Sequence, residues 1–278
     1  NVRQLPGTGV FNDDLRDGLR GHVFHAGDPG FASGGPGKEE SVKFGIVGAC
    51  HHDQVDYHRV VYSKGSWAAE PAQSINYAEA HDNLTLWDKL QASAPYADEE
   101  TLIAMHKLCG AVVLTSQGIP FLHGGMEFLR TKYGDHNSYQ SPDEVNWMDW
   151  ERKYRYREVF EYYRGLIALR KAHPAFRMGT ADEIRHHLRF LPTAPGLVAY
   201  MLRDHANGDP WETIVVIFNA DSQERKVSLP GHDWVVVVDG HRAGSDMLRQ
   251  FEGDIVSVPS RSALVLVDGA SYRASYSC

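Results

Sequence analysis

The chain has 278 residues, and 28 basic against 36 acidic side chains give it a formal net charge of −8 with histidine neutral. Hydrophobic residues make up 42% of the sequence and aromatic residues 11%, which is typical of a globular protein and excludes the disordered, collagen-like and disulfide-scaffold classes. The acidic balance excludes a nucleic-acid partner, because there is no basic stripe to neutralise phosphates. No membrane partner is expected either, since no apolar run approaches the roughly 18 residues of a membrane span.

Neither cysteine nor histidine spacing predicts a metal or a disulfide framework. The three cysteines are few and scattered: Cys50, Cys109 and Cys278. Two groups of histidines could be ligands: His51, His52 and His58 with Asp53, and the pair His186-His187. Neither has i, i+4 spacing on a helix with a third ligand nearby in the sequence. Glycine motifs for phosphates or dinucleotides are missing as well, so we expect no metal and no cofactor.

Up to about residue 180, short apolar strands alternate with helices. Strands are predicted at residues 10–12, 74–78 and 119–123. Helices are predicted at residues 39–49, from Asp98 as N-cap to about 116, and around 159–170. This order is typical of parallel βαβ units, and polar residues gather where each predicted strand ends. A (β/α)8 barrel carries its active site at those ends, but only three of its eight units are visible.

Beyond residue 180, almost every apolar segment has the pattern of a strand. The predicted strands cover residues 184–191, 197–203, 213–219, 226–229, 234–238, 255–258 and 263–267. So many short strands within about 90 residues predict an antiparallel β-sandwich. Because this part has no cluster of functional polar residues, we interpret it as a packing and stabilising domain, with a carbohydrate-binding surface as the alternative.

The densest polar motif is Glu79-Ala80-His81-Asp82-Asn83, which follows a predicted strand. A carboxylate beside a histidine can orient a substrate hydroxyl or shift the pKa of a second carboxylate. The structural alternative is a turn capped by the aspartate and asparagine side chains. A second polar segment, residues 130–139, mixes amides, carboxylates and aromatic rings, as sugar-binding loops do.

Three segments resemble the type I pullulanases of the α-amylase superfamily, glycoside hydrolase family 13. They are INYAEAHDNLTLWDKL at 75–90, QGIPFLHGGMEFLRTKYGDHNSYQSPDEVNWMDW at 117–150 and VFNDDLRDGLRG at 10–21. The resemblance implies an α/β plus all-β fold with two parts. Residues 1–180 would be the C-terminal part of the catalytic (β/α)8 TIM barrel, strands six to eight, and residues 181–278 the C-terminal β-sandwich.

The family resemblance also implies a function and a set of site residues. It implies a retaining debranching enzyme that hydrolyses α-1,6-glucosidic bonds in pullulan, starch or glycogen-type α-glucans, with an aspartate nucleophile and a glutamate acid/base. By motif match, Asp82 is the further carboxylate that stabilises the transition state. His81 and Asn83 match substrate contacts beside it, and Asn137 and Tyr139 fall in a loop that lines the substrate groove in similar enzymes.

The family motifs for the nucleophile and the acid/base are absent from this sequence. We therefore expect both residues upstream of residue 1, and no turnover by this chain alone. The expected partners are an α-glucan and either the missing N-terminal half of the barrel or a second copy of the chain. Two alternatives stay open: an isoamylase-type debranching enzyme, and a non-catalytic α-glucan-binding protein. The compartment is undetermined between cytoplasmic and secreted, with the cytoplasm preferred.

Overall fold

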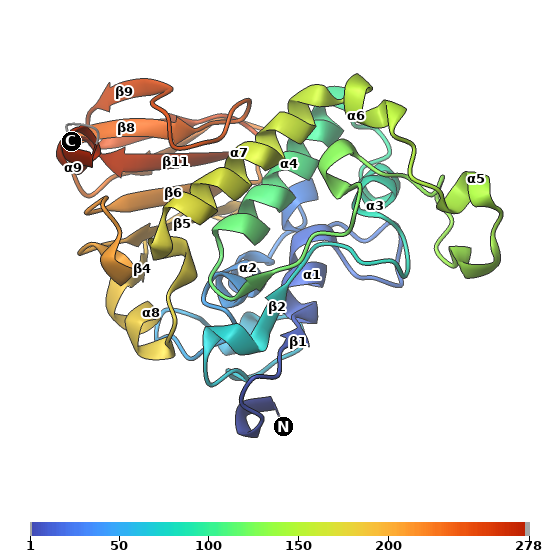
Figure 1. Ribbon diagram of the computed structural model, residues 1–278, viewed down its shortest axis with the longest axis horizontal. Helices are drawn as coiled ribbons and strands as arrows, with labels where there is room; N and C mark the ends of the chain where they lie inside the picture. The colour runs from blue at the N-terminus through green and yellow to red at the C-terminus, as the bar shows by residue number, and fades with distance from the viewer. Residues whose placement is uncertain (1, 276–278) are drawn as a thin grey trace.

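The computed structural model describes residues 2–275 and divides its strands between a small parallel sheet and two antiparallel sheets (Figure 1). The parallel sheet has the order β1-β2-β3, formed by Val10–Phe11, Ser74–Asn76 and Ile119–Pro120. The register pairs Phe11 with Ile75 and Ile75 with Ile119. All three strands therefore point the same way, and their carboxyl ends meet at one edge.

Seven α-helices accompany this parallel sheet within the described part of the chain. They are α1 (Asp13–Arg20), α2 (Glu39–Ile46), α3 (Leu86–Ser93), α4 (Glu99–Thr115), α5 (Asp143–Asn146), α6 (Glu151–Arg155) and α7 (Arg157–Ala172). Side-chain caps start three of them, since Asn12, Thr85 and Asp98 accept bonds from Leu15 N, Asp88 N and Thr101 N. Short 3₁₀ turns lie at Val2–Gln4, Phe31–Ser33, Tyr57–Arg59, Pro71–Gln73, Met126–Phe128, Ser138–Gln140, Pro174–Arg177 and Ala206–Gly208.

The rest of the described chain is mainly antiparallel. Six strands form one sheet in the order β4-β5-β6-β11-β8-β9, made of Leu188–Phe190, Leu197–Leu202, Ile214–Asn219, Ser262–Asp268, Asp233–Val238 and Arg249–Glu252. Two more strands pair with each other, β7 (Arg225–Ser228) and β10 (Ile255–Val258). Helix α8 (Ala181–His187) precedes β4, and α9 (Gly269–Ser275) follows β11.

Strand alternation gives the six-stranded sheet two buried faces. Residues such as Val198, Tyr200 and Val216 join the large core shared with α4 and α7. Their sequence neighbours Ala199 and Val215 face the other way and pack against the β7–β10 pair. Helices thus cover one face and the two-stranded sheet covers the other, because successive side chains point to opposite sides.

Most predicted elements are present, but the first predicted strand of the antiparallel part is wrong over half its length. Residues 181–187 form α8, and the strand starts only at Leu188. A capping box explains the helix: Glu183 N donates to Thr180 Oγ1, and Thr180 N donates to Glu183 Oε2. The sequence prediction also lacked α1 and α3, each only eight residues long.

A buried arginine joins α7 to the end of α4 and the start of β3. Arg170 donates to the carbonyl oxygens of Leu114 (3.0 Å), Ser116 (2.7 Å) and Gly118 (2.8 Å). Burial lowers the pKa of Arg170 to about 10. The last carbonyls of a helix have no partner within the helix, so this guanidinium supplies donors that the α4 terminus lacks.

The two cysteines within the described residues lie in the core. Cys50 and Cys109 are buried and unpaired, and burial raises the pKa of the Cys50 thiol to about 12. Cys278 lies outside the described residues. Among residues 2–275, no helix combines the length and the apolar character needed to cross a bilayer.

Replacing Arg170 with methionine should destabilise the fold strongly. The substitution keeps apolar volume but leaves three carbonyl acceptors without their donor, so we expect the free energy of unfolding to fall by about 3 kcal/mol. Urea unfolding of the 278-residue chain measures this. The control Arg164→Met removes an exposed arginine from the same helix and should change stability by less than about 0.5 kcal/mol. Equal stability of the two variants would contradict the assignment.

His106 should make the fold sensitive to mild acid. It is fully buried, its Nδ1 lies 3.2 Å from Tyr163 Oη, and burial lowers its pKa to about 3. The pKa of an unfolded histidine is about 6.5. Below that pH the unfolded state takes up a proton that the folded state does not, so the free energy of unfolding falls as the pH drops. Between pH 6 and 4 the free energy of unfolding should fall with a contribution approaching about 1.4 kcal/mol per pH unit. His106→Gln should remove that contribution, whereas the exposed control His51→Gln should keep it; an unchanged slope in His106→Gln would refute the prediction.

Candidate functional site

The carboxyl edge of the parallel sheet collects polar side chains from all three strands. Asp13 follows β1, Tyr77 and Glu79 follow β2, and His123 follows β3. The Tyr77 ring packs with two further aromatic rings at this edge. The centroid of the Phe11 ring lies 4.7 Å from that of Tyr77 and 5.2 Å from that of Phe121. The edge therefore offers both hydrogen-bonding groups and flat apolar surface, the combination that suits a sugar ring.

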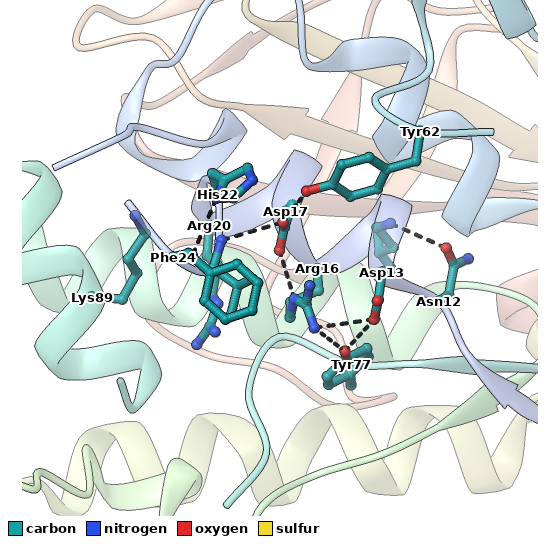
Figure 2. Close-up of polar contacts among 12 residues, drawn as sticks. Asn12, Asp13, Arg16, Asp17, Arg20, His22, Phe24, Tyr62, Tyr77 and Lys89 are labelled. Atoms are coloured by element: carbon teal, nitrogen blue, oxygen red, sulfur yellow. Dashed lines mark hydrogen bonds and ion pairs between the residues drawn. The ribbon is translucent and has the colours of Figure 1, made fainter. Parts of the chain in front are cut away.

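Arg16 of α1 is the centre of the polar network behind this edge (Figure 2). Its guanidinium donates to the Asp17 carboxylate at 2.6 Å and to the Tyr77 hydroxyl, and it lies 3.0 Å from Asp13. The Tyr77 hydroxyl in turn donates to Asp13 Oδ1 at 2.5 Å. One arginine thereby ties the end of β1, helix α1 and the end of β2 together, with geometry fixed by its rigid fork of donors.

Asp17 is the most enclosed carboxylate of this network. It is 1% exposed and accepts bonds from Arg16, from the Tyr62 hydroxyl and from Val23 N. Burial alone would raise the pKa of Asp17, but the hydrogen bonds from Arg16 and Tyr62 outweigh it and hold that pKa below its usual value. Burial and the bond to Asp17 raise the pKa of Tyr62. Asp17 therefore stays ionised, and its role here is to hold Arg16 rather than to exchange protons.

A second chain of contacts crosses from β2 to the segment after β3. The buried Glu79 carboxylate accepts from Leu86 N and lies 2.9 Å from His123 Nδ1. His123 Nε2 is 3.2 Å from an Arg130 nitrogen. Glu79 thus fixes the turn that follows it from both sides, and it stands at the base of the predicted motif at residues 79–83.

His81 and Asp82, the two central residues of that motif, face solvent. Their side chains are 82% and 79% exposed, and His81 Nε2 lies 3.5 Å from Asp82 Oδ1. Asn83 follows with φ of 63°, a left-handed conformation that asparagine tolerates well. Beneath them, Lys132 is 5% exposed and donates from Nζ to the His81 carbonyl at 2.6 Å. A buried ammonium therefore holds the backbone from which an imidazole and a carboxylate project.

Asn137 and Tyr139 lie on a segment that projects beside α5, away from the parallel sheet (Figure 1). Both are exposed, and Asn146 holds the segment through bonds to the Ser138 and Ser141 carbonyls at 2.6 and 3.0 Å. Asn137 N donates to Asp135 Oδ1 at 2.9 Å, a contact within the same segment. The structure thus brings His81, Asp82 and Asn83 together and leaves the other two candidates on a separate element.

Sequence reasoning missed the residues that organise this site. Asp13 and Tyr77 carried a usable signal, since each stands just after a predicted strand. Arg16 could have been paired with Asp13 at i, i+3 had α1 been recognised. Lys132 carried no signal, because a lysine in a polar loop is ordinarily solvated. Within the described residues, no group of metal-ligating side chains lies at this edge. The group that was found, His186, His187 and Asp204, lies elsewhere in the fold.

The chain is similar to pullulanases both in sequence and in structure. A family model for the "Pullulanase, all-beta domain" matches residues 184–242. The chain is 40% identical over 236 residues to the pullulanase of Bacillus subtilis (strain 168), covering 83% of this chain and 31% of that protein. It superposes with a TM-score of 0.87 and 47% identity on a solved pullulanase from Paenibacillus barengoltzii in complex with maltohexaose and alpha-cyclodextrin, covering 97% of this chain and 40% of that one. With type I pullulanase from B. subtilis str. 168 complexed with maltose, the TM-score is 0.89 at 36% identity, covering 97% of this chain and 36% of that one.

These relatives are all pullulanases, and the structural similarity extends over 97% of this chain. The chain therefore belongs to the pullulanase family, and it is consistent with the C-terminal portion of a type I pullulanase. The chain spans between about a third and two fifths of the length of these relatives.

Removing the Lys132 ammonium should loosen the backbone at residues 81–83. In Lys132→Met the His81 carbonyl loses a charged donor, which corresponds to about 1.5 kcal/mol of local opening free energy, or roughly tenfold faster amide exchange. Hydrogen–deuterium exchange of the peptide covering these residues measures it. Lys171→Met, at an exposed lysine of α7, is the matched control and should leave that exchange unchanged. Unaltered exchange in Lys132→Met would show that the lysine does not hold this segment.

Proposed function

We propose that this chain is the C-terminal part of a pullulanase-like debranching enzyme that hydrolyses α-1,6-glucosidic bonds in pullulan, starch or glycogen-type α-glucans. The observation that carries the proposal is the similarity to pullulanases over nearly the whole chain, two of them solved with maltohexaose or maltose. In this proposal residues 1–180 supply strands six to eight of a catalytic (β/α)8 barrel, represented by β1, β2 and β3. Residues 181–278 form the C-terminal β-sandwich, with the β7–β10 pair as its second layer.

The proposed roles follow from the position of the polar motif after β2. Asp82 stabilises the transition state by binding hydroxyl groups of the sugar at the scissile bond, where positive charge develops on the ring. His81 donates a hydrogen bond to the same sugar, and Asn83 makes a neighbouring contact. Asn137 and Tyr139 lie farther along the bound glucan, with the Tyr139 ring offering a flat face to its C–H surface. The exposure of His81 and Asp82 supports these roles, because a glucan could reach both side chains directly.

Retaining hydrolysis also needs a nucleophile and an acid/base, and neither family motif occurs in this sequence. We propose that a second polypeptide segment supplies them and completes the barrel. Two features support this: Phe11 and Ile119 of the parallel strands are 46% and 43% exposed, and an apolar cleft of about 650 Å³ lies beside β3. The cleft is lined by Pro71, Ile119, Pro120, Leu122, Ile167 and Met178 among others. A second copy of this chain is the other candidate to cover this edge.

The isolated 278-residue chain should release no reducing sugar from pullulan. A double displacement needs a nucleophile and an acid/base, and Asp82 in its proposed role replaces neither. Supplying an upstream polypeptide that carries both missing motifs should restore turnover. In that complex Asp82→Asn should lower kcat by roughly 100-fold or more, whereas Asp53→Asn, at an exposed aspartate elsewhere, should not. Release of reducing sugar is the measurement, with size-exclusion chromatography to report association.

Each outcome of that experiment bears on a specific claim. Turnover by the isolated chain would overturn the requirement for a second segment. Glycogen cleaved in preference to pullulan would favour the isoamylase-type reading, and glucan binding without turnover in the complex would favour a binding protein. A normal kcat in Asp82→Asn would remove Asp82 from the catalytic machinery.

A further inference from the structure

Three side chains outside the carboxyl edge of the parallel sheet form a group that has no role in the proposed function. His186 and His187 end α8, and Asp204 lies in the connection from β5 to β6. One ligand atom from each lies within 4.8 Å of the other two. We propose that these residues bind a divalent transition-metal ion of the zinc class, which clips the end of α8 to the β5–β6 connection.

Strand pairing explains why sequence spacing did not reveal the third ligand. In the antiparallel pair β4–β5, Leu188 stands opposite Leu202. The pairing continues beyond β4, since Arg203 N donates to the His187 carbonyl at 3.1 Å. In an antiparallel pair, the next residue along one strand lies opposite the preceding residue of the other. Asp204, which follows Arg203, is therefore brought near His186, which precedes His187. Ligands remote in sequence are thereby held together by the sheet.

A backbone contact holds the His187 ring in one tautomer. Its Nδ1 lies 2.8 Å from the Arg203 carbonyl oxygen, which can only accept, so Nδ1 carries the proton. Nε2 is left with its lone pair available. Metal-ligating histidines commonly donate their other ring N–H to a backbone carbonyl in this way, which fixes both tautomer and ring direction.

The other two groups complete a donor set that suits zinc. The His186 ring centroid is 4.7 Å from that of His187, and the Asp204 side chain is 59% exposed. Two imidazole nitrogens and one carboxylate oxygen favour Zn²⁺ and its transition-metal neighbours over Ca²⁺ or Mg²⁺, which prefer all-oxygen sites. Asp204 has φ of 58°, so the ligand sits on a left-handed residue where asparagine is also well accommodated.

Arg203 opposes cation binding and sets a limit on the affinity. Its Nε lies 3.5 Å from Asp204 Oδ2, and its Nη2 donates to the His186 carbonyl at 3.1 Å. A metal ion must share the Asp204 carboxylate with this guanidinium or displace it. The His187 orientation does not depend on the Arg203 side chain, because the acceptor is the Arg203 backbone carbonyl.

The test measures metal binding by the 278-residue chain without a polyhistidine tag. Titration calorimetry with ZnCl₂ gives the affinity and the number of sites, and the visible spectrum after addition of Co²⁺ reports the type of ligand. We expect one site per chain, a Co²⁺ spectrum with nitrogen ligation, and a rise in Tm on adding Zn²⁺. His187→Ala and Asp204→Asn should each weaken binding by at least about tenfold. His51→Ala, which removes an exposed histidine paired with Asp53, should leave binding unchanged.

Circular dichroism spectra and thermal melting of each variant without metal show whether it is still folded. They therefore distinguish the loss of a ligand from the loss of the fold, and we expect Asp204→Asn to stay folded. Arg203→Gln removes the competing charge but keeps the backbone carbonyl, so it should tighten zinc binding. The proposal is overturned if wild type binds no zinc. It is equally overturned if folded Asp204→Asn and His187→Ala bind as tightly as wild type, because the ion would then sit elsewhere.

Discussion

The contact on which most of the structure depends is the buried guanidinium of Arg170 against the backbone between α4 and β3. Three carbonyls there, of Leu114, Ser116 and Gly118, take their hydrogen bonds from this one side chain. Gln117, between them, donates to the Ala175 carbonyl and accepts from Met178 N, both at 2.9 Å. A buried polar segment is stable only when each group is paired, so α7 and the chain after it must stay where they are for α4 to end here.

That constraint also fixes where the two sheets lie. The Thr115 carbonyl, at the end of α4, accepts from the Tyr200 hydroxyl of β5 at 2.8 Å, which ties the antiparallel sheet to the same point. On the other side, Asn76 of β2 donates to the Gln117 carbonyl at 2.8 Å. The direction in which β3 leaves this junction then sets the position of His123, and through Glu79 the position of the exposed His81 and Asp82. The candidate site therefore rests on packing well behind it.

Sequence alone predicted the strongly patterned elements, but it missed a local capping box and the contacts that join distant segments. Helix α4 was predicted because Asp98 caps a long apolar segment, and β10 because Ile255–Val258 alternates between turns. The segment at 184–187 was misjudged because its capping box competes with an apolar pattern that suits a strand. The motif at 79–83 could be predicted as polar and adjacent to a strand, but not the support from Lys132, which lies about 50 residues away. The approach of Asp204 to the histidine pair depends on strand register in the same way.

The edge strands of the antiparallel and the parallel sheet differ in the polarity of their side chains. The edge strand β9 carries Arg249 and Glu252, charges that discourage a further strand from pairing. The edges of the parallel sheet carry Val10, Phe11 and Ile119, all at least 38% exposed. An apolar edge of this kind favours addition of another strand, and parallel strands are ordinarily buried on both faces. The β9 edge is therefore protected against further pairing, whereas the edges of the parallel sheet are apolar and exposed, and this difference is a physical reason for proposing a second polypeptide segment beside β1 and β3.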